Sequence, residues 1–369
     1  MIKRLLQKNK NKFLTGLHEI SPKAIVMRDK KVVLAVIVLT AGIGINLVNA
    51  QGGAGQITIA GGFTPAPLML KAGEKLVSKA PQYKPPQFLN NDTTTGFKLF
   101  CSGAGPETPS LNAGTRDIRP SELELCDKNG VKGVVQLHLG RDALVAAQAS
   151  GGRLKTISRK DFFLAVAKDV PDPKDSTKLI PNPHKTWKSI NPDLPDSKIQ
   201  VLAPEATVGL YQTYMNSLIM VGCRQVESLK ALEASDPKAF DAACKTFRKD
   251  GSYTEFTKVP DAIQELKASV DTVGVVALTM VLKNNLTALV LDGMEPNVVK
   301  VSRNEYELTF SMQVFLKRSH IGVIPGLKEY LTELTSEEAT GLVGYFYDMG
   351  VIPLPANDRK KVRAEVTAL

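Results

Sequence analysis

The sequence predicts an α/β protein with two lobes, and two observations carry this prediction. Short apolar segments of strand character alternate along the chain with segments whose apolar residues recur at helical spacing, the order expected of mixed or parallel sheets. Once the N-terminal leader described below is set aside, about 319 of the 369 residues remain. That length exceeds what one hydrophobic core usually serves, so two lobes are expected.

The first predicted elements surround a glycine-rich loop. Residues 57–59 alternate like a strand and run into GGFTP at residues 61–65, after which residues 68–77 have a helical pattern. A loop in this position directs backbone N–H groups at the space before the helix, where anions bind readily. Glycine turns usually serve only a tight bend, so the loop alone is a weak indication of a site.

The remaining elements follow from the same patterns. Strands are predicted at residues 134–139, 144–147, 198–202 and 273–277, and helices at residues 159–167, 208–221 and 326–334. Residues 171–195 are rich in Pro, Asp, Lys and Asn, which predicts a surface loop. Within that loop Trp187, the only tryptophan, is expected to anchor the chain to the core rather than to contact a ligand.

The leader has the features of a secretory signal peptide. About fourteen uncharged residues, 32–45, follow Lys30 and Lys31 and precede small residues that end at Ala50. A retained membrane anchor is the alternative, but a spanning helix needs roughly 20 apolar residues. We therefore expect cleavage after Ala50 and export across the cytoplasmic membrane to the periplasm.

The stretch before this signal is long for a targeting flank. Residues 27–31 would make an ordinary basic flank by themselves, so we expect translation from Met27 and interpret residues 1–26 as a gene-model extension. Beyond the leader, no further segment of the sequence is long and apolar enough to span a bilayer. The exported product is therefore expected to be soluble.

The net charge of the whole chain is a poor guide to its partners. It is +10, but residues 1–50 hold nine Lys or Arg and two Asp or Glu, which leaves 38 basic and 35 acidic residues in the exported part. No block of Lys and Arg with interleaved aromatic residues remains there. A nucleic-acid partner is therefore not expected.

All four cysteines lie in the exported part, at Cys101, Cys126, Cys223 and Cys244. An even number in an oxidising compartment indicates disulfides, with three possible pairings. We expect sequence neighbours to pair, 101 with 126 and 223 with 244, which closes loops of about 25 and 20 residues, each worth roughly 3 kcal/mol. Four buried free thiols are the alternative. A zinc site is not expected, because no Cys-x-x-Cys spacing occurs and the four histidines are scattered.

Motifs of the common enzyme classes are missing from the sequence. SGAG at residues 102–105 has Phe100 where a nucleophile elbow needs its leading glycine. There is no Walker loop, no His-Glu-x-x-His and no dinucleotide fingerprint. We therefore expect a binding protein rather than an enzyme, with no catalytic residue, no cofactor and no metal.

Several segments together resemble one known family. They are residues 97–101 (FKLFC), 108–109, 121–131 (SELELCDKNGV), 187–201 (WKSINPDLPDSKIQV), 221–253, 320–326 (HIGVIPG), 352–354 and 360–365 (KKVRAE). In this order they are similar to the periplasmic phosphate-binding proteins of ABC uptake systems, and the similarity covers nearly the whole exported chain. The chain is identified as a divergent member of that family.

The resemblance implies a type II periplasmic-binding-protein fold, in which two lobes, each a mixed sheet flanked by helices, are joined by a hinge of crossover strands. It places lobe 1 at residues 56–140 and 290–369 and lobe 2 at residues 141–289. It also implies a monomeric receptor that binds a small molecule, phosphate or a related oxyanion, and delivers it to an ABC permease in the membrane.

The resemblance also assigns ligand contacts, mostly to hydroxyl groups. The residues that fall on the family's binding positions are Thr64, Thr93, Thr94, Thr95, Arg116, Thr207, Gly209 and Tyr211. Arginine donates paired, charge-assisted hydrogen bonds to an oxyanion, so Arg116 is expected to be the main fixed positive charge of the cleft.

At several positions of the same loops, Tyr211 among them, this chain departs from the family. Apolar or aromatic residues replace hydroxyl groups and charged side chains, at Phe63, Val208, Leu210, Tyr211 and Phe310. Each lost charge-assisted contact removes roughly 1.5–3 kcal/mol of binding free energy. Three functions therefore remain open: an oxyanion receptor, a paralogue whose cleft is rebuilt for a less charged ligand, and a ligand-free structural or interaction protein on the same scaffold.

Overall fold

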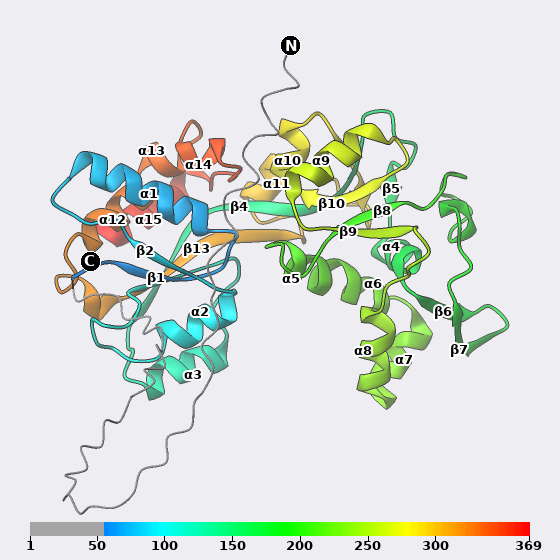
Figure 1. Cartoon of the computed structure of the whole chain (residues 1–369), viewed down its shortest axis with the longest axis horizontal. Coiled ribbons are helices and arrows are strands. Elements are labelled where there is room, and N and C mark those ends of the chain that lie inside the picture. The colour runs from blue at the N-terminus through cyan, green and yellow to red at the C-terminus, as the bar shows by residue number, and fades with distance from the viewer. Residues whose placement is uncertain (1–54) are drawn as a thin grey trace, which may run out of the picture. The chain divides into compact units, whose positions relative to one another are not determined.

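The structure, a computed structural model, describes residues 55–369, which belong to one compact unit (Figure 1). The predictions for the leader, namely cleavage after Ala50 and translation from Met27, lie outside the described residues. Between residues 55 and 369, no helix has both the length and the apolar character needed to cross a membrane.

Strands and helices alternate along the chain, as the sequence predicts. The strands are β1 (Thr58–Gly61), β2 (Gln87–Asn90), β3 (Leu111–Gly114), β4 (Val134–Gln148), β5 (Thr156–Ile157), β6 (Asp169–Asp172), β7 (Asp175–Pro181), β8 (Val201–Pro204), β9 (Tyr253–Phe256), β10 (Val273–Ala277), β11 (Thr287–Ala288), β12 (Val290–Leu291) and β13 (Thr309–Lys317). The helices before residue 250 are α1 (Ala66–Lys79), α2 (Thr93–Phe100), α3 (Pro120–Lys128), α4 (Arg159–Val166), η1 (Trp187–Ser189), α5 (Tyr211–Thr213), η2 (Tyr214–Ile219), α6 (Met220–Arg224), α7 (Glu227–Ser235) and α8 (Pro237–Lys245). Those after it are α9 (Val259–Ala268), α10 (Leu278–Lys283), α11 (Val298–Ser302), η3 (Arg318–His320), α12 (Leu327–Leu334), α13 (Glu337–Thr340), α14 (Tyr345–Asp348) and α15 (Ala356–Thr367).

A nine-stranded sheet organises the described chain, in the order β2-β1-β3-β13-β4-β10-β8-β9, with β11 also paired to β4. β1 is parallel to β2 and β3, and β8 is parallel to β9 and β10. β13 and β4 are antiparallel to each other and to their outer neighbours β3 and β10. The two long strands thus connect two parallel groups, and Figure 1 shows them running from one group to the other.

Burial of the strands explains the apolar runs from which the sequence predicts β1, β8 and β10, although β3 was not predicted. β1, β3, β8 and β10 are buried at every position, as expected of strands covered by other elements on both faces. The predicted strand at residues 273–277 is confirmed as β10, whereas the strand predicted at 198–202 begins later, at Val201 in β8.

The strands predicted separately at residues 134–139 and 144–147 are wrong as two elements, because they form the single strand β4. The intervening residues keep their ladder with β13, in which Gly140 lies opposite Met312 and Asp142 lies opposite Phe310. Arg141 also exchanges two backbone hydrogen bonds with Ile352, at 2.8 and 2.7 Å. These long-range partners satisfy the backbone of a polar segment that the local pattern treats as a break.

The helix predicted at residues 208–221 begins three residues later, at Tyr211. It runs from α5 through the π-helical turn η2 into α6 and ends at Arg224. The segment predicted as a surface loop, residues 171–195, holds most of the exposed hairpin β6–β7 and the short helix η1. Trp187 in η1 is fully buried, which confirms its predicted role as an anchor.

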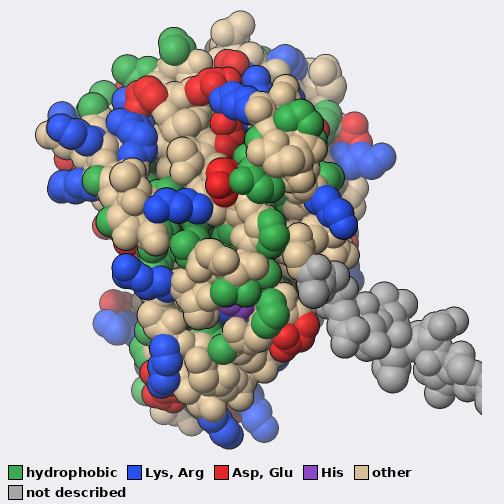
Figure 2. All heavy atoms as spheres, turned by 90° about the vertical axis from the view of Figure 1, so that its left-hand side faces the viewer, with side chains coloured by type: hydrophobic (Ala, Val, Ile, Leu, Met, Phe, Trp, Pro, Cys, Tyr) green, Lys and Arg blue, Asp and Glu red, His purple; other side chains and the backbone are tan. Residues whose placement is uncertain are grey.

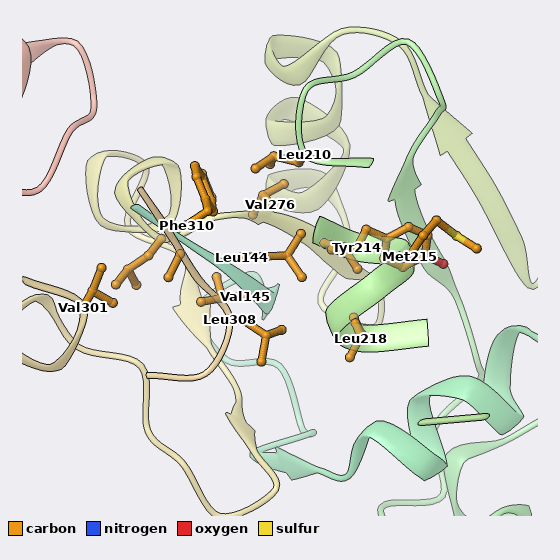
Figure 3. Packing of buried hydrophobic residues seen from close by; sticks show 14 of the residues in the cluster. Leu144, Val145, Leu210, Tyr214, Met215, Leu218, Val276, Val301, Leu308 and Phe310 are labelled. Atoms are coloured by element: carbon orange, nitrogen blue, oxygen red, sulfur yellow. The ribbon is translucent and has the colours of Figure 1, made fainter. Parts of the chain in front are cut away.

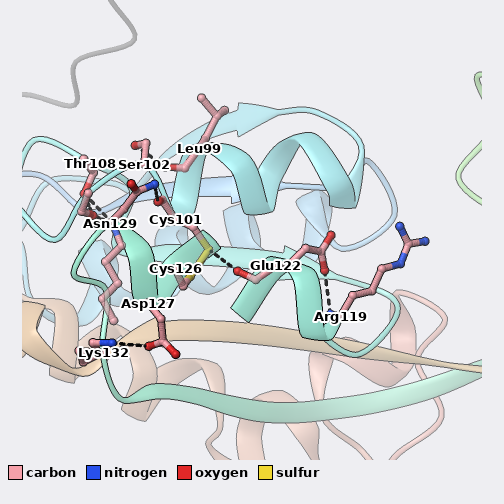
Figure 4. The surroundings of a disulfide bond; sticks show 12 residues. Leu99, Cys101, Ser102, Thr108, Arg119, Glu122, Cys126, Asp127, Asn129 and Lys132 are labelled. Atoms are coloured by element: carbon pink, nitrogen blue, oxygen red, sulfur yellow. Dashed lines mark hydrogen bonds and ion pairs between the residues drawn. A yellow bond between two sulfur atoms is a disulfide. The ribbon is translucent and has the colours of Figure 1, made fainter. Parts of the chain in front are cut away.

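Both predicted disulfides are present. Cys101, which follows α2, bonds to Cys126 of α3, and Cys223 of α6 bonds to Cys244 of α8. Figure 4 shows the first bond between its two helices. It lies in a small hydrophobic cluster made of Phe97, Phe100, Cys101, Cys126, Val131 and Phe315.

A second, much larger hydrophobic cluster extends along the sheet. It includes Leu144 of β4, Phe310 of β13 and, from the segment around α5, Leu210 and Tyr214 (Figure 3). Burying a side chain of this kind contributes roughly 1.5–3 kcal/mol, so this cluster is the main source of the fold's stability. It also surrounds the cavity described next.

Candidate functional site

A cavity of about 340 Å³ lies beside the central pair of strands, within the size range of small-molecule sites. Segments from distant parts of the sequence converge on it: the start of α1, the loop before α5, strands β4, β10 and β13, helix α10 and the chain after α14. Its walls are formed by Thr64, Pro67, Leu68, Asp142, Val208, Gly209, Leu210, Val259, Ala277, Thr279, Met280, Phe310, Met312, Met349, Gly350 and Val351.

The register of β4 and β13 places the cavity's main side chains together. Asp142 lies directly opposite Phe310, and side chains of directly opposed residues share one face of an antiparallel pair. Met312, two residues further along β13, points to the same face, because strand side chains alternate. Its partner is Gly140, where a Cβ atom would lie 2.3 Å from Val351 Cγ1, so glycine permits the chain after α14 to close over the strands.

Among the described residues that form the cavity wall, Asp142 is the only charged one, and it is 3% exposed. Its Oδ1 accepts hydrogen bonds from the backbone N–H groups of Ala143 (2.8 Å) and Thr279 (3.3 Å), and its Oδ2 accepts one from the Thr279 hydroxyl (2.5 Å). Burial raises the pKa of Asp142 to about 7, although these hydrogen bonds act in the opposite direction. No Lys, Arg or His within residues 55–369 lines the cavity.

Two of the predicted ligand residues, Thr64 and Gly209, line this cavity and touch each other across it. A Cβ atom at Gly209 would lie 1.9 Å from Thr64 Oγ1, so only glycine allows the loop before α5 to approach so closely. The neighbours Val208 and Leu210, identified as departures from the family, also line the cavity, as does Phe310.

The predicted threonines at the start of α2 belong to a different group of residues. The Asp92 carboxylate caps this helix, because Oδ1 accepts from the backbone N–H groups of Thr94 (2.8 Å) and Thr95 (3.1 Å). The Thr95 hydroxyl donates to Oδ2 of the same carboxylate at 2.5 Å. These donors are the ones an oxyanion would use at a helix start, and they are already occupied by a negative charge.

Arg116 is bound to Glu122 of α3 through two hydrogen bonds, Nη1 to Oε2 at 2.8 Å and Nη2 to Oε1 at 2.6 Å. Nη2 also donates to Thr94 Oγ1 at 3.1 Å, and the guanidinium lies over the Phe97 ring. Burial alone would raise the pKa of Glu122, but hydrogen bonds from Arg116 and the Arg119 backbone N–H hold it below its usual value. The charge of Arg116 is therefore neutralised by a partner within the chain. We call Asp92, Thr93, Thr94, Thr95, Arg116 and Glu122 the α2 polar cluster.

The last two predicted ligand residues lie near the cavity in sequence but do not line it. Thr207 is exposed in the loop before α5, and Tyr211 opens that helix, with its ring centroid 6.4 Å from that of Tyr214. Of the eight predicted residues, the cavity thus receives Thr64 and Gly209, and their roles in binding stay predictions.

Sequence reasoning missed most of the cavity wall. Asp142 and its partner Thr279, the thioethers of Met280, Met312 and Met349, and the chain at Gly350 were not singled out. One local signal existed, because Asp142 is a carboxylate directly before the apolar run of residues 143–147. A lone carboxylate in such a run needs a buried hydrogen-bond partner or a site.

Comparison with known proteins gives the family and the fold. A model of the PBP superfamily domain matches residues 48–338. The chain is 21% identical over 302 residues to the phosphate-binding protein PstS of Bacillus subtilis (strain 168), covering 81% of each chain.

Solved structures show the same fold. One, described as a possible phosphate binding protein from Planctomyces limnophilus, has a TM-score of 0.61 at 17% identity and covers 85% of this chain and 98% of its own. An ABC-type phosphate transport receptor from Vibrio cholerae has a TM-score of 0.55 at 16% identity, covering 81% of this chain and 100% of its own. The predicted fold class, an α/β type II periplasmic-binding-protein fold, is confirmed, while the predicted lobe boundaries stay a prediction.

Proposed function

The chain belongs to the PBP superfamily. From this premise we propose that it is a solute-binding protein, not an enzyme, and that its cavity takes a small, largely apolar solute rather than free phosphate. It acts as the extracytoplasmic receptor of an ABC importer. The observation that carries the proposal is the composition of the cavity wall, in which apolar side chains and Asp142 stand where an oxyanion would need cationic donors.

The electrostatics of the wall oppose an oxyanion. A dehydrated phosphate needs many hydrogen-bond donors and benefits most from arginine. Here the Thr279 hydroxyl and backbone N–H are used by Asp142, and ionised Asp142 repels an anion. Arg116, expected to supply the positive charge, is paired with Glu122 and does not line the cavity.

Retained phosphate binding is the second candidate, favoured by the names of the relatives and by the Thr64 hydroxyl in the cavity wall. It would require Arg116, which does not line the cavity and donates to Glu122 through both terminal nitrogens, to reach the bound anion. The apolar replacements at Val208, Leu210 and Phe310 line the same cavity and support the first candidate.

Location and partners follow from the same proposal. The leader ending at Ala50 supports export to the periplasm, and the relatives support an ABC permease as the membrane partner. Basic and acidic side chains are interspersed on the face shown in Figure 2, which gives no support to a nucleic-acid partner. The receptor is proposed to act as a monomer.

A ligand screen by thermal unfolding tests the proposal. The protein purified after expression of the full chain is heated with inorganic phosphate, with sulfate, and with neutral apolar solutes such as butanol and isoamyl alcohol. A ligand that binds only the folded state raises the melting temperature as it saturates the site. We expect neutral solutes to raise it and phosphate to leave it unchanged; stabilisation by phosphate alone would contradict the proposal.

A pair of matched variants localises the binding. Val208→Trp fills the cavity from a partly exposed loop position and is expected to abolish the shift caused by neutral solutes. Val299→Trp makes the same change at an exposed position of α11 that does not line the cavity, and should leave the shift intact. Equal loss in both variants would place the ligand elsewhere.

A further inference from the structure

The cavity wall contains a buried carboxyl group with no cationic partner. All three hydrogen-bond donors to Asp142 in the described chain are neutral, and the side chain is 3% exposed. Taking a carboxylate out of water without a cation costs several kcal/mol, so such a group is retained for a structural or a binding reason. The hydrogen bonds to Thr279 supply a structural reason for its position but leave its charge uncompensated.

Charged residues near Asp142 are directed elsewhere. Lys283 of α10 contributes a weak attraction, but its Nζ is exposed and donates to the backbone oxygen of Asp348 at 2.5 Å. Arg141 precedes Asp142 in β4, so its side chain lies on the opposite face of the strand, where it donates to the backbone oxygen of Ser302. The side of Asp142 that faces the cavity therefore meets no positive charge of the described chain.

The residues around this carboxyl group suit a cation. Phe310 is its directly opposed partner across the β4–β13 ladder, and both line the cavity. The face of an aromatic ring attracts a cation, with a contribution that grows when water is excluded. Three thioethers, from Met280, Met312 and Met349, add polarisable and adaptable apolar surface.

We infer, building on the proposed function, that the ligand is a small organic cation whose ammonium group lies between the Asp142 carboxylate and the Phe310 ring, with its apolar body against the methionines. Asp142 then determines specificity, since it selects a positive charge that the apolar wall by itself would reject. The same arrangement excludes phosphate and carboxylate solutes, because they would place two negative charges in one low-dielectric cavity.

The protonation of Asp142 supplies an independent readout. Burial raises the pKa of this carboxyl to about 7, so in the free protein it is largely protonated at about pH 6. A bound ammonium group stabilises the ionised form and therefore displaces a proton into solution. A neutral solute in the same cavity displaces none.

Calorimetry with isosteric probes tests the inference. Butylammonium, butanol and butanoate have similar size and differ in charge, and inorganic phosphate serves as the fourth probe. At about pH 8 we expect butylammonium to bind at least roughly tenfold more tightly than butanol, and butanoate and phosphate not to bind. At about pH 6, titrations in buffers of different ionisation enthalpy should reveal proton release with butylammonium alone.

Two variants separate charge from shape. Asp142→Asn keeps the side-chain size and an acceptor for the Thr279 backbone N–H, and should abolish both the preference for butylammonium over butanol and the proton release. Phe310→Leu keeps the cavity apolar and removes the aromatic face, so it should lower the ratio of butylammonium affinity to butanol affinity several-fold. If Asp142→Asn does not fold, the preference of the unaltered protein and the Phe310→Leu variant still decide the question.

The possible outcomes distinguish the inference from the function on which it rests. Equal binding of butanol and butylammonium by the unaltered protein overturns the inference and leaves an apolar-solute receptor. Binding of phosphate alone overturns both. A preference for butylammonium that Asp142→Asn retains shows that another group recognises the charge, and also overturns the inference.

Discussion

The cavity beside β4 and β13 and the α2 polar cluster both contain charged side chains. They differ in whether those charges have partners within the chain. In the α2 polar cluster, Arg116 is paired with Glu122 and the Asp92 carboxylate is satisfied by the helix start. In the cavity, Asp142 receives hydrogen bonds from neutral groups only. The charge of Arg116 in the cluster is therefore balanced within the chain, whereas the Asp142 carboxylate in the cavity has no cationic partner in the described chain.

This difference shows that polar residues at family positions do not by themselves make a binding site. Thr94, Thr95 and Arg116 have the side chains that an oxyanion requires, yet the Thr95 hydroxyl and the terminal nitrogens of Arg116 already donate to partners within the chain. The cavity has fewer polar groups, but one of them, the hydrogen-bonded Asp142 carboxyl, has no ionic partner in the described chain. Availability of a donor, acceptor or charge therefore distinguishes the two regions better than composition does.

The largest expected effect concerns the unpaired charge of Asp142. Its pKa is about 7 in the folded protein and about 3.9 in an unfolded chain. The folded state therefore holds a proton that the unfolded state loses between these values, so the free energy of unfolding falls as pH rises from about 4 to about 7, by up to about 4 kcal/mol. Urea unfolding of the unaltered protein and of Asp142→Asn across this range measures the difference. Parallel pH profiles would show that Asp142 has an ordinary pKa.

Removing the disulfide beneath the α2 polar cluster is expected to have the next largest effect. Cys101→Ser combined with Cys126→Ser opens a loop of 25 residues, and should lower the free energy of unfolding by roughly 3 kcal/mol. The bond joins α2 and α3, neither of which lines the cavity, so solute binding should persist in the folded variant. Urea unfolding and calorimetry on the same preparation check both statements. Loss of solute binding in a folded variant would mean that the two regions are coupled.

A smaller effect is expected when the ion pair of the cluster is broken. Glu122→Gln removes the negative partner of Arg116 and should cost about 2 kcal/mol of stability, because the pair is largely buried. Asp127→Asn, at another position of α3, breaks an exposed ion pair with Lys132, which follows the helix; it is the matched control and should cost no more than about 1 kcal/mol.

The same variant tests whether pairing keeps the cluster from binding anions. With Glu122 neutralised, Arg116 regains an uncompensated charge next to Thr94. Glu122→Gln should therefore gain a measurable affinity for phosphate that the unaltered protein lacks, detected as a phosphate-dependent rise in melting temperature. Tight phosphate binding by the unaltered protein, lost in Glu122→Gln, would reverse the interpretation of the cluster.

The smallest effect is expected from Arg116→Ala on binding in the cavity. Arg116 does not line the cavity, so the affinity for a cavity solute should change less than about twofold. The resemblance to phosphate-binding proteins predicts the opposite, a loss of roughly 30-fold or about 2 kcal/mol for an oxyanion. Calorimetry on the unaltered protein and the variant distinguishes the two regions directly.

The sequence alone determined the family, the fold class and the disulfides, because these depend on local patterns and on their order along the chain. A short continuous apolar run identified β10, and helical patterns identified α4 and α12. The departures at Val208, Leu210 and Phe310 were visible as well, and all three line the cavity. Each of these features is encoded by neighbours within a few residues or by similarity of short segments.

Only the tertiary structure decided where charge is available. The ladder that sets Asp142 against Phe310 joins strands from distant parts of the chain, and a shift of one residue would turn one of them to the other face. The pairing of Arg116 with Glu122 likewise depends on how α3 packs beside α2. Local sequence patterns record which side chains are present, but the partner of each charge is fixed by long-range packing, and that partner determines whether the charge can bind a ligand.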